Sequence, residues 1–211
     1  MTSLRFPVNG ILFDCDGVLV DSLEPAAVAW DRWAATYSPG YDFRTQVSHG
    51  VRAADTVAEL VAPDVLSAAI AALEEEEVRG ADLTKPIAGS VALTRSLPAH
   101  VWAVVTSAAR RLAVARLAAS GHPIPKELVA AEDVEAGKPS PDPYLLGARL
   151  LGLDPDTCVV FEDAPAGVLA ARRAGVRFVI GVGDHLEDAE VDARVEDLST
   201  VRYLDGAIHL G

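Results

Sequence analysis

A chain of 211 residues, half of them hydrophobic, is long enough to bury the core of one domain with a modest insert, which excludes disordered and low-complexity proteins. Its net charge of −13, from 18 basic and 31 acidic residues, disfavours nucleic acid and anionic membranes as partners. The apolar runs are shorter than the ~18 residues of a membrane span, and the N-terminal run is too short for a signal peptide. We therefore expect a cytoplasmic, monomeric protein that acts on a small molecule.

The first predicted strand, residues 10–13, is followed by a long helical segment. Helical patterns cover residues 25–36, 52–60 and 64–79, and no strand pattern is evident between residues 22 and 83. We interpret residues 18–84 as a small all-helical cap inserted after the first strand, and residues 84–89 as its return to the core. Such a cap would close over a site by bending at residues 18–20 and 85–89.

From residue 85 onward, short apolar runs alternate with helical patterns. The runs at 101–106, 128–131, 158–161 and 177–182 are typical of buried strands, and the intervening patterns at 109–119, 141–151 and 164–174 are typical of helices. This alternation predicts an α/β fold with a doubly wound parallel sheet, built from residues 1–17 and 85–211. Cys15 and Cys158 lie in apolar surroundings and are expected to be buried, reduced thiols.

Two carboxylates stand where the first strand ends. Asp14 and Asp16 are two residues apart, a spacing that puts both side chains on one face at the carboxyl edge of the sheet, where ligands bind in such folds. Close carboxylates repel unless one is protonated or a cation lies between them, and their hard oxygens suit Mg²⁺. Taken alone, the motif is equally well explained as an Asp-x-Asp-Gly turn.

A second strand also ends in two acids. Glu162 and Asp163 follow the apolar residues 158–161 and precede a predicted helix, which Asp163 alone could simply cap. Two acid-tipped strands in one sheet are harder to explain by chance, and together they would form a metal site of three or four carboxylates.

Two further motifs are weak when taken singly. Thr106 and Ser107 end another strand before a helix, where they could bind a phosphate or merely cap the helix. Lys138 is one of only three lysines and stands in a Gly-Lys-Pro turn, which gives it a defined direction from which it could neutralise a nucleophilic carboxylate and a phosphoryl group. An isolated Gly-Lys-Pro would be read as a surface turn.

Together, in this order, these motifs resemble those of the haloacid-dehalogenase-like (HAD) hydrolases, and the resemblance covers essentially the whole chain. The matching positions are Asp14 and Asp16, Thr106 and Ser107, Lys138, and Glu162 with Asp163. Residues 48–52, 137–144 and 160–167 look like the branch of glycerol-phosphate and sugar-phosphate phosphatases that neighbours β-phosphoglucomutase. Four ordered motifs are specific where each alone is not.

The resemblance implies a two-step hydrolysis of a phosphate ester. Asp14 would attack phosphorus to form an aspartyl-phosphate, and Asp16 would protonate the leaving alkoxide and then take a proton from the attacking water. Mg²⁺ would be held by the Asp14 carboxylate, the Asp16 backbone carbonyl and Asp163, with Glu162 close by.

The resemblance also assigns the substrate contacts. Thr106 and Ser107 would bind phosphoryl oxygens, and Lys138 would balance the charge on Asp14 and the phosphoryl group. Arg52, reaching down from the cap, would clamp the substrate. His49, the one cap histidine in the sequence, would either contact substrate or be structural.

Several alternatives stay open on the sequence. A dehalogenase would not need Asp16, and phosphonate cleavage through a cap lysine is disfavoured because no lysine precedes Lys85. A mutase would carry a histidine where this chain has Ala26, which favours hydrolysis. The remaining reading, a non-catalytic binder of phosphorylated ligands, is disfavoured by the intact catalytic set.

Overall fold

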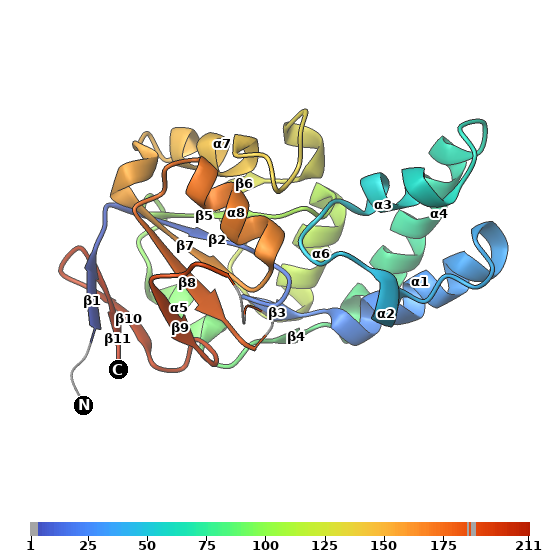
Figure 1. Ribbon diagram of the computed structural model, residues 1–211. Helices are drawn as coiled ribbons and strands as arrows, with labels where there is room; N and C mark the ends of the chain where they lie inside the picture. The colour runs from blue at the N-terminus through green and yellow to red at the C-terminus, as the bar shows by residue number, and fades with distance from the viewer. Residues whose placement is uncertain (1–3, 185, 187–188) are drawn as a thin grey trace.

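The core of the computed structural model is a fully parallel sheet in the order β6-β5-β2-β7-β8-β9 (Figure 1). The structure describes residues 4–184, 186 and 189–211. The strands of this sheet are β2 (Gly10–Phe13), β5 (Trp102–Val105), β6 (Glu127–Val129), β7 (Cys158–Glu162), β8 (Phe178–Val182) and β9 (Ala193–Val195).

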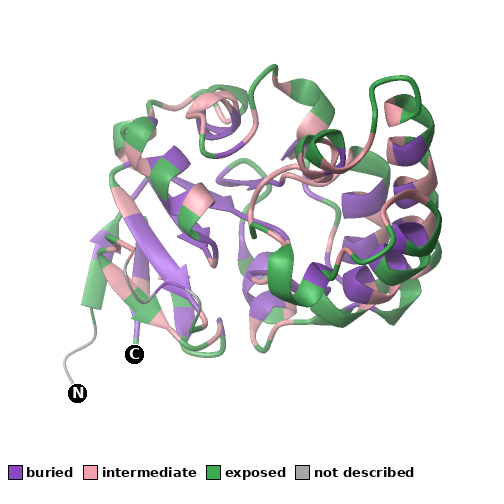
Figure 2. Ribbon diagram, turned by 45° about the vertical axis from the view of Figure 1, so that its right-hand side comes forward, coloured by how far each residue is buried: buried purple, intermediate pink, exposed green. Residues whose placement is uncertain are grey.

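Helices cover both faces of this sheet, so the predicted doubly wound α/β class is confirmed. Leu12 and Val160 pack with α7 (Asp142–Leu150) and α8 (Pro165–Arg173) on one face. Phe13 and Phe161 point to the other face, toward α5 (Ser90–Ser96) and α6 (Arg110–Ala119), and their rings stack at 5.1 Å. The central strands are buried on both faces because their side chains alternate between these two layers (Figure 2).

Each predicted core strand is present, displaced by at most two residues at either end. The sequence patterns missed β9 and a separate antiparallel sheet of order β1-β11-β10, formed by Leu4–Pro7, Ala207–Leu210 and Val201–Leu204. They also missed α5. The strands β1, β9 and β10 are partly exposed, and such strands lack the continuous apolar run that marks a buried parallel strand.

The cap segment is helical, as predicted, with its own apolar core. It contains α1 (Leu23–Tyr37), α2 (Phe43–Gln46), α3 (Ala53–Leu60) and α4 (Leu66–Arg79). The Trp33 indole donates a hydrogen bond to the carbonyl of Ala69 at 2.9 Å, and the rings of Trp30 and Phe43 stack at 5.4 Å. These contacts fix α1 against α4 and α2, so the cap helices pack as one layer at the right of Figure 1.

The two chain segments that join cap and core lie side by side. β3 (Val20–Asp21) pairs with β4 (Lys85–Pro86) in an antiparallel ribbon, and the amide of Ile87 donates to the carbonyl of Leu19 at 3.0 Å. Short 3₁₀ segments occupy Ala81–Leu83, Ala131–Asp133 and Pro155–Thr157. The ribbon coincides with the predicted bending segments, whose movement remains a prediction.

Both cysteines are buried free thiols, as predicted. Across residues 4–184, 186 and 189–211, the helices are all too short or too polar to span a bilayer.

Candidate active site

The predicted motifs meet at the carboxyl edge of three neighbouring strands. Asp14 and Asp16 follow β2, Thr106 and Ser107 follow β5, and Glu162 ends β7, with Asp163 next. The strand order places β2 between β5 and β7. Parallel strands bring their carboxyl ends to one edge, which is why residues separated by up to about 150 positions converge there.

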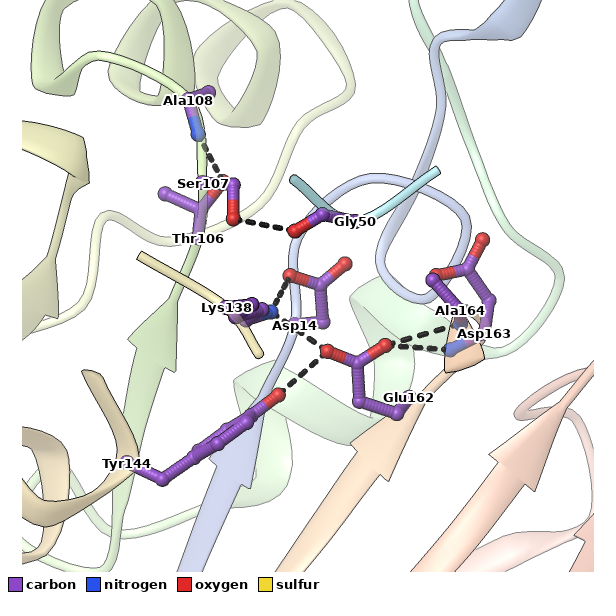
Figure 3. A network of polar contacts seen from close by, with 10 residues as sticks. All are labelled: Asp14, Gly50, Thr106, Ser107, Ala108, Lys138, Tyr144, Glu162, Asp163 and Ala164. Atoms are coloured by element: carbon purple, nitrogen blue, oxygen red, sulfur yellow. Dashed lines mark hydrogen bonds and ion pairs between the residues drawn. The ribbon is translucent and has the colours of Figure 1, made fainter. Parts of the chain in front are cut away.

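Lys138 lies at the centre of this edge, paired with two carboxylates (Figure 3). Its ammonium is 2.6 Å from Asp14 Oδ1 and 2.6 Å from Glu162 Oε1, and the lysine is only 2% exposed. The Tyr144 ring lies 5.1 Å from the same ammonium. A buried cation between two buried acids is a strong electrostatic arrangement, because little water screens it.

Glu162 is held by four hydrogen bonds. The Tyr144 hydroxyl donates to Oε1 at 2.7 Å, alongside Lys138, while the amides of Asp163 and Ala164 donate to Oε2 at 3.0 and 3.1 Å. Helix α8 closes against this carboxylate: a Cβ on Gly167 would lie 1.7 Å from Oε1. Both oxygens are therefore already occupied by donors of the chain, an arrangement that suits an anchor for Lys138 better than a free metal ligand.

Burial raises the pKa values of Asp14 and Asp163, because the nearby positive charge of Lys138 offsets only part of its effect. Burial raises the pKa of Asp14 from 3.8 to about 7, against the opposing attraction of Lys138. Burial, followed by the charges of Asp14 and Glu162, raises the pKa of Asp163 well above its usual range. Burial by itself would lower the pKa of Lys138, but Asp14 and Glu162 more than offset it and raise that pKa above its ordinary value. The three acids outnumber the one buried cation, Lys138, so ionising all of them together calls for a further positive charge.

This donor set fits a hard divalent cation. One carboxylate oxygen each of Asp14, Asp163 and Glu162 lie within 4.8 Å of one another, and Asp14 and Asp163 are the two of these acids that are not held by the backbone amides around Glu162. The chain approaches Asp163 closely at Gly17, whose φ is +82° and where a Cβ would fall 1.9 Å from Asp163 Oδ2. Excess carboxylate charge and a backbone cradle at the same point are what a Mg²⁺ site needs.

Asp16 is not one of the clustered acids and has partners of its own. Its Oδ1 accepts hydrogen bonds from the Ser22 hydroxyl at 2.6 Å and from Arg116 Nη1 at 2.9 Å. Sequence reasoning missed Arg116. The available signal was a charged residue on the apolar stripe of a helix, since Leu112 and Ala113 precede it at helical spacing.

The cap touches the core beside these residues. The Ser107 hydroxyl donates to the carbonyl of Gly50 at 2.7 Å (Figure 3), whereas the Thr106 hydroxyl accepts the amide of Ala108 at 3.0 Å. Ser107, predicted to bind phosphate, therefore also holds the cap loop.

Arg52 reaches from the cap to the core, as predicted, but its forked edge is already occupied. Its Nε and Nη2 pair with both oxygens of Asp55 at 2.8 and 2.9 Å, and its Nη1 donates to the carbonyl of Glu135 at 3.1 Å. The side chain also lies against Gly137, the residue before Lys138. A two-pronged grip on substrate would require Arg52 to release Asp55.

A cavity of about 500 Å³ lies between cap and core. Its floor contains Asp14, Asp16, Thr106, Ser107 and Asp163. Its cap wall is largely apolar, with the aromatic rings of Trp30 and Phe43, and His49 and Ala26 also line it. The volume suits a small ligand whose reactive group points to the floor.

The fold and the site together indicate where a ligand binds. The buried Asp–Lys–acid cluster lies under the helical cap at the carboxyl edge of a parallel sheet, which is where open α/β sheets bind their ligands. The sequence model of the haloacid dehalogenase-like hydrolase family matches residues 8–175, so the chain belongs to this family.

The relatives narrow the class within the family. Hexitol phosphatase A of Escherichia coli is 40% identical over 81% of this chain and 82% of its own. Glycerol-1-phosphate phosphohydrolase 2 of Saccharomyces cerevisiae is 36% identical over 94% and 86%. A crystal structure of a hydrolase from Pseudomonas syringae matches with a TM-score of 0.80 and 26% identity, covering 90% and 94% of the two chains. The predicted family and branch are confirmed, and the protein is a phosphoric monoester hydrolase.

Proposed function

We propose that this protein is a Mg²⁺-dependent phosphatase that hydrolyses a small sugar or polyol monophosphate through an aspartyl-phosphate. The observation that carries the proposal is the Lys138 ammonium held 2.6 Å from Asp14 Oδ1 at the floor of the cavity. A carboxylate that attacks a phosphate dianion must be relieved of electrostatic repulsion, and a buried lysine beside it supplies part of that relief.

In the first step, an oxygen of Asp14 attacks phosphorus and the bond from phosphorus to the ester oxygen breaks. Asp16, which lies two residues on and remains partly open to the cavity, donates its proton to the leaving oxygen. In the second step Asp16 takes a proton from water, the water oxygen bonds to phosphorus, and Asp14 is released. Thr106, already accepting the Ala108 amide, would donate its hydroxyl proton to a phosphoryl oxygen.

The metal would be held by the Asp14 carboxylate, the Asp16 carbonyl and Asp163, with Glu162 behind them orienting Lys138. When bound there, Mg²⁺ would neutralise and orient the phosphoryl group. Arg52 would grip the substrate from the cap after exchanging its Asp55 partner.

The cavity wall favours an ester with no second anionic group. Glu74, Glu77 and Asp21 line the cap side. Of the two arginines among the described lining residues, Arg116 is paired with acids, and Arg52 must leave Asp55 before it can pair with the transferred phosphate. A second phosphate or a carboxylate on the leaving group would face these acids at short range. The relatives' names, a hexitol phosphatase and a glycerol-1-phosphate phosphohydrolase, point to the same uncharged polyol class.

Phosphate release with Mg²⁺ tests the proposal over matched substrates. We expect kcat/KM for fructose 1-phosphate, mannitol 1-phosphate or glycerol phosphate to exceed that for fructose 1,6-bisphosphate and phosphoglycolate by about 10-fold or more, or roughly 1.4 kcal/mol. No Mg²⁺-dependent release from any monophosphate would contradict the proposed function. Equal rates on the bisphosphate would contradict the charge argument alone.

The metal site gives a prediction that needs no turnover. Because a cation bound to the folded state stabilises it by mass action, millimolar Mg²⁺ should raise the melting temperature of the wild-type protein by several degrees, or roughly 1–2 kcal/mol at a ratio of 10–30 to the dissociation constant. Asp163→Asn should melt at the same temperature with Mg²⁺ and with EDTA. Asp184→Asn, a change of the same kind at an exposed lining residue outside the acid cluster, is the control and should respond like wild type. An undiminished Mg²⁺ shift in Asp163→Asn would show that Asp163 is not a ligand.

A further inference from the structure

The buried guanidinium of Arg116 joins the cap to the acid/base candidate Asp16. Arg116 belongs to the core helix α6 and is 4% exposed. Its Nη1 lies 2.9 Å from Asp16 Oδ1, and its Nη2 lies 3.2 Å from Oε1 of Glu77, a buried residue of the cap helix α4. One planar group therefore connects a carboxylate of the site to a carboxylate of the cap.

Stability alone is a poor reason for an arginine at this position. The rest of the buried stripe of α6 is apolar, with Leu112, Ala113 and Leu117, and Arg116 Nε has no hydrogen-bond partner. Removing such a charge from water costs several kcal/mol, and an apolar residue of similar volume is often at least as stabilising as a buried ion pair. The arrangement makes sense if it controls where the Asp16 carboxylate lies.

The two bonds to Asp16 use the same oxygen. The Ser22 hydroxyl and Arg116 Nη1 both donate to Oδ1, while the Asp16 side chain stays 31% exposed and lines the cavity. This leaves Oδ2 as the oxygen that can carry the proton to or from the ester. A carboxylate held at one oxygen by two donors from different elements has a fixed direction for the other.

We propose that Arg116 is a positioning residue that aims Asp16 Oδ2 at the leaving oxygen, and that Glu77 holds Arg116 in place when the cap lies on the core. This inference rests on the proposed function, because it concerns the same proton transfer. Cap position and proton transfer are then linked through one side chain: the acid is correctly directed only while α4 supplies Glu77.

The chain contains a matched control for this pair. Arg111 and Glu75 also join α6 to α4, but both side chains are more than half exposed and neither lines the cavity. Glu77→Gln and Glu75→Gln are the same chemical change on the same helix, two residues apart, across the same interface. Only the first should alter proton transfer.

A series of aryl phosphates isolates that step. The value of kcat/KM reports the steps up to cleavage of the ester. 4-Nitrophenol is acidic enough to leave without a proton, whereas phenol, whose pKa is about 10, is a poorer leaving group that depends more on a general acid. The ratio of kcat/KM for 4-nitrophenyl phosphate to that for phenyl phosphate is measured within one protein sample, so it is insensitive to the fraction that is folded. Asp16→Asn sets the upper limit of this ratio.

We expect Glu77→Gln to raise the ratio by about 5-fold and Arg116→Met by about 10-fold or more, both smaller than the total contribution of about 10²–10⁴-fold that general acid catalysis supplies. The ratio for Arg116→Lys should lie between those of wild type and Arg116→Met, because an ammonium lacks the planar fork with which a guanidinium can bind both acids at once. Glu75→Gln should leave the ratio at the wild-type value.

Equal ratios in the Glu77 and Glu75 variants, or an unchanged ratio in Arg116→Met, would overturn the inference. An unchanged ratio in Asp16→Asn would instead overturn the acid role of Asp16 in the proposed function, and the inference would fall with it.

Discussion

Asp14→Asn should reduce phosphate release by about 10⁴-fold or more, the scale of loss seen when a covalent nucleophile is removed. The amide keeps the shape of the side chain but offers one weakly nucleophilic oxygen and no charge to attract a cation. Lys138 would then keep its pairing with Glu162 and lose its pairing with Asp14. Steady-state phosphate release under saturating Mg²⁺ measures the loss.

The covalent step can be measured separately. Wild-type protein quenched in acid during turnover of a ³²P-labelled ester should carry label that hydroxylamine releases, as acyl phosphates do, and Asp14→Asn should carry none. Residual turnover within about 100-fold of wild type, or hydroxylamine-sensitive label in the variant, would show that another group attacks phosphorus.

The same variant should be no less stable than wild type, and its stability has a defined pH dependence. Burial raises the folded-state pKa of Asp14 from 3.8 to about 7, so between these pH values the folded protein binds more protons than the unfolded chain. Stability contributed by this group therefore falls as pH rises from about 4 to about 7. In EDTA, the melting temperature of Asp14→Asn relative to wild type should rise over this range. A constant difference would mean that Asp14 is not destabilised by burial.

The sequence was most informative where strands end. Each central strand is a short apolar run, and the acids and hydroxyls directly after it had to reach the same edge once the sheet was recognised as parallel. That is why strand geometry could bring Asp14, Glu162 and Asp163 together, whereas Thr106 stayed a weak candidate at the same edge until the family resemblance was considered. Lys138 needed the family resemblance, because a turn residue has no position fixed by strand geometry.

Residues whose partners come from other elements could not be predicted. Arg116 lies 100 positions from Asp16 in the sequence, and Tyr144 reaches Glu162, the last residue of β7, from helix α7. The place of Arg116 on an apolar stripe marks it as unusual, but its partner, like that of Tyr144, depends on how its helix packs. Arg52 illustrates the converse: its approach to the core was predicted, but its pairing with Asp55 depends on rotamers that no periodicity encodes.

Lys138→Met should cause the largest combined loss of stability and activity. Methionine is unbranched like lysine and only one atom shorter, but it leaves the 6%-exposed Asp14 and the fully buried Glu162 without their shared cation. Removing one partner of a buried ion pair typically costs about 3–5 kcal/mol, and the lost charge at the reacting group should lower kcat/KM by roughly 10³-fold. Urea unfolding in EDTA and phosphate release with Mg²⁺ measure the two effects.

A double variant separates these two effects. Glu162→Gln removes one of the uncompensated charges, although its one carbonyl oxygen can accept from the Tyr144 hydroxyl or from the amides of Asp163 and Ala164 but not from both. Lys138→Met with Glu162→Gln should therefore recover part of the lost stability. Activity should stay low, because nothing replaces the ammonium 2.6 Å from Asp14. If activity returned together with stability, Lys138 would serve only to neutralise Glu162, and its role beside the nucleophile would have to be abandoned.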